Sequence, residues 1–140
     1  MKSRALVTVV SGLDTLDGDK PDTITLTTQG TFEEADGVYK LFYSEQSEDG
    51  VTETEVTVLS PTHIQVSREG VNCFLLDADL GKRYIGIYNT PYGELDMGIY
   101  PSEVKALFSD GGASLHMKYT VDFNAQLASE NTIDITVKQI

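Results

Sequence analysis

The feature of this sequence that most restricts its fold is a period of two in its hydrophobic residues. The pattern is clearest between Ser114 and Phe123, where every second residue is a large apolar one and the residues between them are polar. Successive side chains of a β-strand point to opposite faces of a sheet, so this period predicts a strand with one buried face. Similar patterns predict further strands at residues 5–11, 22–29, 37–45, 52–60, 63–69, 72–77 and 127–138.

Turn residues separate the predicted strands at regular intervals, and Asp49-Gly50 is a strong hairpin signal among them. Residues 103–108 could form a helical turn after Ser102, but their apolar residues alternate, which favours a strand. We read residues 32–36 as a polar connection. The sequence therefore predicts about ten strands with little or no helix, in one domain that spans residues 1–140.

Strands that follow one another through short turns usually pair with their neighbours in sequence. An antiparallel sheet of this length curls, and closure into a barrel removes its exposed edges. The fold class that we expect is therefore all-β, a single antiparallel up-and-down β-barrel. A two-sheet sandwich is the alternative, although the sequence has neither the tryptophan nor the cysteine pair of an immunoglobulin domain.

The composition excludes several classes of partner and compartment. The formal net charge is −12, from 22 acidic and 10 basic residues, and such a surface repels nucleic acids and anionic membranes. Cys73 is the single cysteine, so no internal disulfide can form, and its apolar neighbours predict a buried, inert thiol. The apolar run at residues 5–10 is too short for a signal peptide and alternates like a strand, so we expect a cytoplasmic protein.

No motif for catalysis or for metal binding is evident. His63 and His116 are far apart in sequence and are predicted on outward faces, and no zinc motif contains them. The acidic residues between Gly12 and Pro21 lack the ligand spacing of a calcium-binding EF-hand loop. We therefore expect no cofactor, no metal and no catalytic residues, and an enzyme is the weakest of three functional hypotheses.

Residues 82–100 (KRYIGIYNTPYGELDMGIY) hold four of the seven tyrosines and predict a central hairpin. Pro91 and Gly93 suit a three-residue loop, which would place Thr90 opposite Glu94. That register would leave two glycines facing each other, as a floor of bare backbone with tyrosine walls. A ligand ring or a partner's backbone could approach there, or the glycines could simply let the sheet bend under a covering tyrosine. The predicted pairs are Tyr84–Tyr100, Ile85–Ile99, Gly86–Gly98 and Ile87–Met97.

Two arginines are predicted to point toward an apolar face. Arg68 is in phase with Ile64 and Val66, and Arg83 is in phase with the isoleucines of the hairpin. A charge in such a place needs a carboxylate, a ligand anion or water. Either arginine could lie at a strand end and extend into solvent, whereas arginines at the mouth of the barrel would select an anionic ligand.

Residues 88–93 read YNTPYG and are followed by Leu95 and by Met-Gly-Ile at 97–99. This motif resembles the hallmark of the DUF1934 family, the YwiB-like small bacterial proteins of unknown function. Residues 25–30 and 127–131 give supporting matches, so the resemblance covers nearly the whole chain. It implies a lipocalin-like, calycin-type β-barrel in the cytoplasm of a Gram-positive bacterium, and it implies no activity, substrate or catalytic residue.

Three functional hypotheses follow, in decreasing order of support. The first is binding of a small, partly apolar ligand in the interior or mouth of the barrel. The second is an interaction with a partner protein, or with a second copy of the chain, through the exposed face of the hairpin at residues 82–100. The third is an enzyme of unknown type. The candidate ligand-binding residues are Arg68, Arg83, Tyr84, Gly86, Tyr88, Tyr92, Gly98 and Tyr100.

Overall fold

The computed structural model describes residues 2–15, 22–70, 74–90 and 93–140, and these ranges contain ten strands and no helix. The strands form one sheet in which every neighbouring pair is antiparallel. The all-β prediction is therefore confirmed. The strands are β1 (Lys2–Asp14), β2 (Asp22–Ala35), β3 (Val38–Ser47), β4 (Gly50–Ser60), β5 (His63–Gly70), β6 (Phe74–Asp79), β7 (Tyr84–Thr90), β8 (Gly93–Ser109), β9 (Gly112–Phe123) and β10 (Gln126–Gln139).

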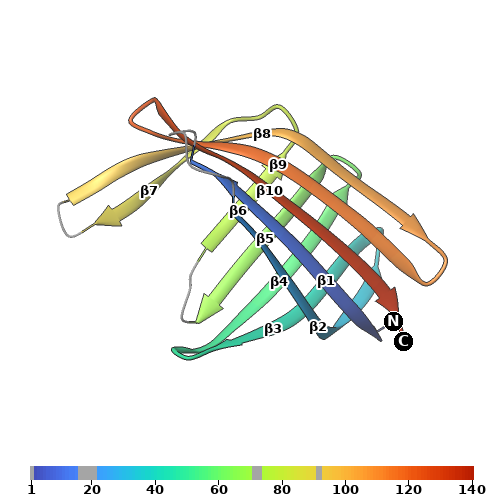
Figure 1. The fold of residues 1–140 in the computed structure, drawn as a ribbon. Coiled ribbons are helices and arrows are strands. Elements are labelled where there is room, and N and C mark those ends of the chain that lie inside the picture. Colours follow the sequence, from blue (N-terminus) through green and yellow to red (C-terminus); the bar gives the residue numbers. More distant parts are fainter. Residues whose placement is uncertain (1, 16–21, 71–73, 91–92) are drawn as a thin grey trace.

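The sheet curls into a half-barrel, which confirms the predicted barrel and excludes the sandwich (Figure 1). The strand order is β6-β5-β4-β3-β2-β1-β10-β9-β8-β7, so the first and last strands pair and the edges are β6 and β7. Two backbone hydrogen bonds of 2.9 Å join β8 to the other side of the curled sheet. The Gly81 amide, after β6, donates to the Pro101 carbonyl, and the Ala106 amide donates to the Pro61 carbonyl, after β4. Beyond this contact, the hairpin of β7 and β8 stands away from the body of the barrel (Figure 1).

Two strands run further than predicted. β8 joins the second half of the predicted hairpin at residues 82–100 to the predicted strand at 103–108. It passes through Pro101 because a shift in its pairing with β9 between Pro101 and Glu103 accommodates the proline. β2 continues to Ala35 through the segment that we read as a polar connection. It does so because Phe32 pairs on both sides, with Ser3 of β1 and Leu41 of β3.

The hairpin of β7 and β8 pairs in a register one residue away from the predicted one. Thr90 pairs with Gly93 rather than with Glu94, and Pro91 and Tyr92, which lie between the strands, are outside the described residues. A two-residue loop sets a different register from a three-residue loop, and every cross-strand partner changes with it. The predicted pairing of Gly86 with Gly98 was therefore wrong. The observed pairs include Tyr84–Ile99, Ile85–Gly98, Gly86–Met97, Ile87–Asp96 and Tyr88–Leu95.

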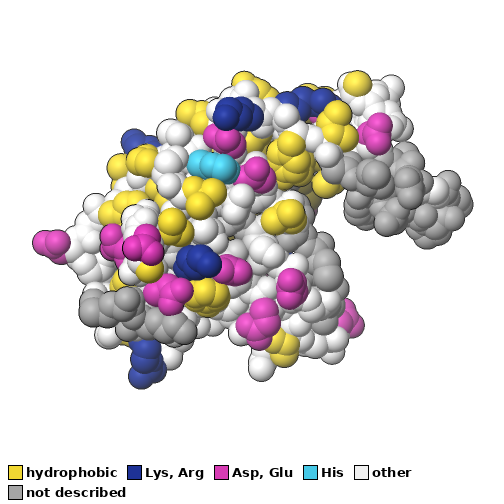
Figure 2. Space-filling model, turned by 180° about the vertical axis from the view of Figure 1, so that it is seen from behind, with side chains coloured by type: hydrophobic (Ala, Val, Ile, Leu, Met, Phe, Trp, Pro, Cys, Tyr) yellow, Lys and Arg dark blue, Asp and Glu magenta, His cyan; other side chains and the backbone are white. Residues whose placement is uncertain are grey.

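The outer surface carries the acidity of the sequence. Acidic side chains are spread over the face seen from behind, with a few basic ones between them (Figure 2). Ion pairs cross several strands of this surface, such as Lys40–Glu55 and Lys118–Glu130. Exposed pairs of this kind add little to the stability of the fold, which therefore depends on the interior.

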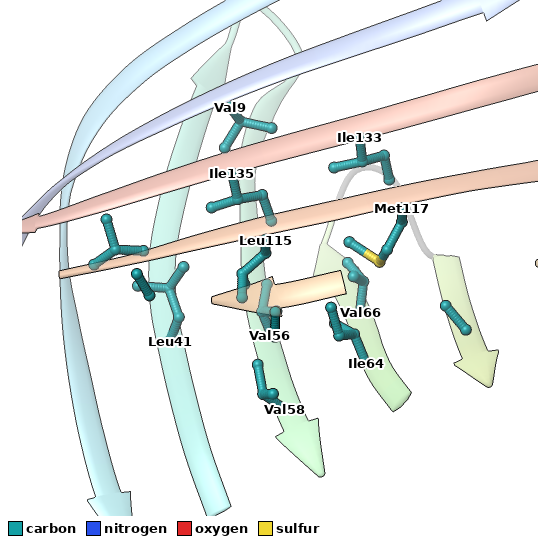
Figure 3. Close-up of a cluster of buried hydrophobic side chains, with 14 of the residues drawn as sticks. Val9, Leu41, Val56, Val58, Ile64, Val66, Leu115, Met117, Ile133 and Ile135 are labelled. Carbon is teal, nitrogen blue, oxygen red and sulfur yellow. The ribbon is translucent and has the colours of Figure 1, made fainter. Parts of the chain in front are cut away.

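The middle of the barrel is filled with apolar side chains (Figure 3). Residues from β3, β4 and β5 meet residues from β1, β9 and β10 there, as the period of two predicts. Because the middle is packed, room for a ligand is found toward the two ends of the barrel. The largest fully buried apolar side chains are those of Val7, Leu41, Val56, Ile64, Val66, Leu76, Ile99, Leu115, Met117 and Ile135, together with Pro101.

Candidate functional site

A cleft of about 540 Å³ lies at the end of the barrel formed by the β2–β3, β4–β5 and β8–β9 turns. We call it the Tyr39 cleft. Its walls combine aromatic and aliphatic side chains with two carboxylates. The residues that define it are Phe32, Glu34, Tyr39, Val58, Phe108 and Asp110.

Three aromatic rings in this cleft are in contact. The ring of Phe32 stacks on that of Tyr39 with centroids 5.4 Å apart and an interplanar angle of 22°. The ring of Phe108 meets Tyr39 at 5.1 Å and 58°. These separations are within the range of favourable aromatic pairs. Phe108 is 52% exposed, so part of its ring is free to contact a bound molecule.

The aromatic rings and the Glu34 carboxylate of the cleft lie on the inner face of the sheet. Phe32 and Glu34 are two residues apart on β2, and their side chains point to the same face. Glu34 pairs with Tyr39, which is buried, so this face is the interior. Phe108 reaches the same face from β8, since it is in phase with the buried Ala106. An inward-pointing carboxylate thus stands beside the aromatic rings.

Tyr39 carries a buried polar group without a partner. The residue is 6% exposed, and its hydroxyl has no hydrogen bond within the part of the chain that the structure describes. Burial, with a smaller contribution from the charge of Glu34, raises the pKa of Tyr39 to about 12. The phenol therefore stays neutral and keeps its proton for donation. An unpaired buried hydroxyl costs stability, and such groups are unusual away from sites that use them.

A second set of hollows, of about 280 and 160 Å³, lies on either side of Arg68. Arg68 is on the inner face, as its phase with Ile64 and Val66 predicts. The larger hollow is lined by Tyr119 and the smaller one by Tyr43, and both tyrosines are buried. We call this region the Arg68 end.

The tyrosines of the Arg68 end are held neutral. Burial raises the pKa of Tyr119 to about 12, and the positive charge of Arg68 opposes this rise. Burial also raises the pKa of Tyr43, and again Arg68 opposes it. The Arg68 end is thus a small polar region inside the barrel, in which the positive charge of Arg68 lies between hollows that are also lined by Asp22 and Glu45.

Arg83 lies on the outer face, so the prediction that it points toward an apolar face was wrong. The register places Arg83 in phase with Ile85, which is 59% exposed. Its guanidinium pairs with Asp122, with 2.7 Å between Nη2 and Oδ1. This hydrogen bond raises the pKa of Arg83. The predicted need for a countercharge is met by a carboxylate of the protein.

The other predicted ligand-binding residues are spread over different parts of the fold. The Tyr84 hydroxyl accepts a hydrogen bond from the Asp77 amide at 3.0 Å and donates to the Leu75 carbonyl at 3.4 Å. Tyr100 is exposed on the outer face. For Gly86 and Tyr88 only the backbone is described, and Tyr92 lies outside the described residues. Arg68, Arg83, Tyr84, Gly98 and Tyr100 therefore do not form one site, and a ligand-binding role for the eight residues stays a prediction.

The Tyr39 cleft was not predicted from the sequence. Phe108 is one of the alternating apolar residues of the predicted strand at 103–108, but no binding role was predicted for it or for Phe32, Glu34 or Tyr39. The available signal was the spacing of Phe32 and Glu34, which continues the alternation of β2 toward the turn. A carboxylate in phase with apolar residues at a strand end indicates a barrel mouth.

No three His, Cys, Asp or Glu side chains group as metal ligands in the described ranges. The same ranges contain no helix that could cross a membrane. Cys73 and most of the acidic segment at residues 12–21 lie outside the described residues, so the predictions for the thiol and for a calcium loop are not addressed. His116, on the outer face, contacts Asp134 and Glu103 at 2.6 and 3.2 Å.

The model of a domain of unknown function, DUF1934, matches residues 7–135. The chain belongs to the DUF1934 family. The crystal structure of the ywiB protein from Bacillus subtilis is similar to this DUF1934 protein, with a TM-score of 0.81 over 99% of this chain and 93% of that chain. The sequences are 19% identical, so the likeness concerns the fold alone, and it supports a lipocalin-like β-barrel. A search of curated proteins found no match.

Proposed function

We propose that this DUF1934 protein binds a small, partly apolar molecule in the Tyr39 cleft, without catalysis, in the bacterial cytoplasm. The observation that carries the proposal is a hollow of about 540 Å³ lined by three aromatic rings in contact. Ligand pockets have volumes of roughly 300–1,000 Å³ and present apolar walls with a few polar groups. The lack of any internal disulfide, with a single cysteine, suits the cytoplasm.

The Tyr39 cleft supports this function better than the Arg68 end does. The hollows at the Arg68 end measure about 280 and 160 Å³, so neither reaches the size of a typical ligand pocket. The packed middle of the barrel separates the two ends. A ligand in the Tyr39 cleft would contact Phe108, which is already half-exposed and therefore requires little rearrangement.

The test is the binding of N-phenyl-1-naphthylamine, a neutral dye whose fluorescence increases in apolar sites. Replacing Phe108 by Ser removes ring area from the cleft and should weaken binding by about tenfold. Leu107→Ser is the matched control, because Leu107 is 55% exposed and points to the opposite face of the same strand. The control should bind the dye as the unmodified protein does.

Absence of dye binding by the unmodified protein would contradict the proposal. Equal losses in Phe108→Ser and Leu107→Ser would also contradict it, because the dye would then report a general loosening of the fold. Circular dichroism of both variants checks that the sheet is intact.

As a second candidate, we propose that the β7 edge binds a partner protein or a second copy of the chain. β7 is an edge strand, and an open edge can pair with a strand of another molecule. Ile85 on this strand is largely exposed. Sedimentation velocity tests the second-copy form: a dimer that Ile85→Lys dissociates would support it, and a monomer at all concentrations would exclude it.

A further inference from the structure

We infer that the Tyr39 cleft selects organic cations, that is, ammonium groups that carry apolar substituents. This inference rests on the proposed function and adds the chemical class of the ligand. Three features of the cleft carry it: the sign of the charges that line it, the exposure of its aromatic rings, and the contrast with the opposite end of the barrel.

The charges of the cleft have one sign. Glu34 and Asp110 line it, and none of its described lining residues is Lys, Arg or His. Neither carboxylate forms an ion pair within the described ranges. With 22 acidic and 10 basic residues, unpaired carboxylates are common in this chain, but these two lie beside aromatic rings in a cleft, and that combination favours a cationic ligand.

The carboxylate of Glu34 acts inside the cleft rather than on the outer surface. It shares the inner face with its cross-strand partner Tyr39. Its negative charge adds to the effect of burial in raising the pKa of the Tyr39 phenol. A cation in the cleft would meet the same negative potential and would be stabilised by it.

The aromatic rings provide a second attraction for a cation. The face of an aromatic ring is negative, and ammonium groups bind over it when they are within about 6 Å of the centroid. Phe108 and Phe32 flank the Tyr39 ring, and both retain exposed surface. Apolar substituents on the ammonium group would fill the remaining volume against Val58 and Leu59.

The opposite end of the barrel differs in its inner charges, because a positive side chain lies there. Arg68 stands there between the two small hollows, and its positive charge opposes the rise that burial causes in the pKa of Tyr43 and Tyr119. Asp22 and Glu45 also line these hollows, so the charges there are mixed, whereas the charges that line the Tyr39 cleft are all negative. Of the two ends of the barrel, the Tyr39 cleft is therefore the more favourable for an organic cation.

The experiment compares choline with its uncharged isostere 3,3-dimethyl-1-butanol, in which a carbon atom replaces the nitrogen. Saturation-transfer NMR on the methyl signal of each compound gives its affinity directly, without a dye. Choline should bind the unmodified protein about 3- to 10-fold more tightly than the alcohol. Phe108→Ser should weaken both compounds, because both contact the ring.

Two variants of β2 isolate the charge. Glu34→Gln should weaken choline about 3- to 10-fold and leave the alcohol unchanged. Glu33→Gln removes the same charge from the neighbouring residue, which points to the outer face, and should change neither affinity. Equal affinities for choline and the alcohol, no binding of choline, or equal effects of the two substitutions would each overturn the cation inference. Binding of N-phenyl-1-naphthylamine is independent of these outcomes, so the proposed function stands or falls separately.

Discussion

Arg83 and Asp122, 39 residues apart in the sequence, are joined by two hydrogen bonds on the outer face of the barrel. The Nη2–Oδ1 distance is 2.7 Å and the Nε–Oδ2 distance is 3.3 Å, which is a bidentate arrangement. The pair lies over Gly98, where an added β-carbon would meet the guanidinium and both carboxylate oxygens. The bare backbone at Gly98 is therefore covered by side chains of the protein itself, and it is not an open floor for a ligand.

The contact between Gly98 and the ion pair predicts a coupled effect of two substitutions. A β-carbon at Gly98 would lie 2.6 Å from each carboxylate oxygen of Asp122, so Gly98→Ala should lower the free energy of unfolding by about 1–3 kcal/mol. In an Arg83→Ala background Asp122 can rotate away, and the same change should cost much less. Urea denaturation of the four proteins of this cycle gives the coupling. Additive effects would contradict the account.

Tyr84 is predicted to hold the two edge strands together. Its hydroxyl bonds to backbone groups of Leu75 and Asp77 on β6, although its own strand is β7. Tyr84→Phe should therefore lower the free energy of unfolding by about 1 kcal/mol and speed hydrogen exchange of the Asp77 amide. Tyr100→Phe, on the exposed outer face, is the matched control. Unchanged exchange at Asp77 in the first variant would show that the hydroxyl does not link the strands.

The network around His116 predicts a dependence of stability on pH. The hydrogen bond with Asp134 is the main cause that raises the pKa of His116 above 6.5, and the bond with His116 is the main cause that lowers the pKa of Glu103 below 4.5. The histidine contribution is complete below pH 6.5 and is lost as the pH rises through its folded pKa. The glutamate contribution is complete above pH 4.5 and is lost as the pH falls through its folded pKa. The network should therefore stabilise the folded protein most between pH 4.5 and pH 6.5.

His116→Gln tests this window. The difference in unfolding free energy between the unmodified protein and the variant should be larger near about pH 6 than near about pH 9. Equal differences at the two values would mean that protonated His116 makes no net contribution. Salt should reduce the difference at the lower pH, because His116 and its partners are partly exposed.

The strands were predictable because one face of each is buried, so that a period of two is imposed on the sequence. This held best for β9, whose inner residues are all apolar. It failed at the end of β2, where Glu34 takes an inward position at the open mouth and thereby resembles a loop residue. The prediction of strands from the period of two failed again at Pro101, because a bulge that tolerates proline leaves no signal in the alternation.

The register of the hairpin and the place of the cleft were not available from local patterns. Pro91 and Gly93 suit loops of two or three residues equally well, and only the pairing of Thr90 with Gly93 decides between them. The Tyr39 cleft joins segments near residues 34, 60 and 110, which are brought together by the curl of the sheet. The alternation of a strand indicates which face of the sheet a side chain occupies, but it does not indicate which turns from other parts of the chain lie beside that side chain. The inward position of Arg68 was predictable because it requires only the phase of β5.

The central claim is that a small molecule binds in the Tyr39 cleft, and mapping the amide shifts of the labelled protein in heteronuclear NMR tests it most directly. On titration with N-phenyl-1-naphthylamine, the account predicts that the largest shifts occur at Gly37, Gly111 and Gly112, which line the cleft. Gly12, which lines a hollow at the Arg68 end, should remain unchanged and serves as the internal control. Shifts centred on Gly12 or on the β7–β8 hairpin, with Gly37, Gly111 and Gly112 unmoved, would contradict the account.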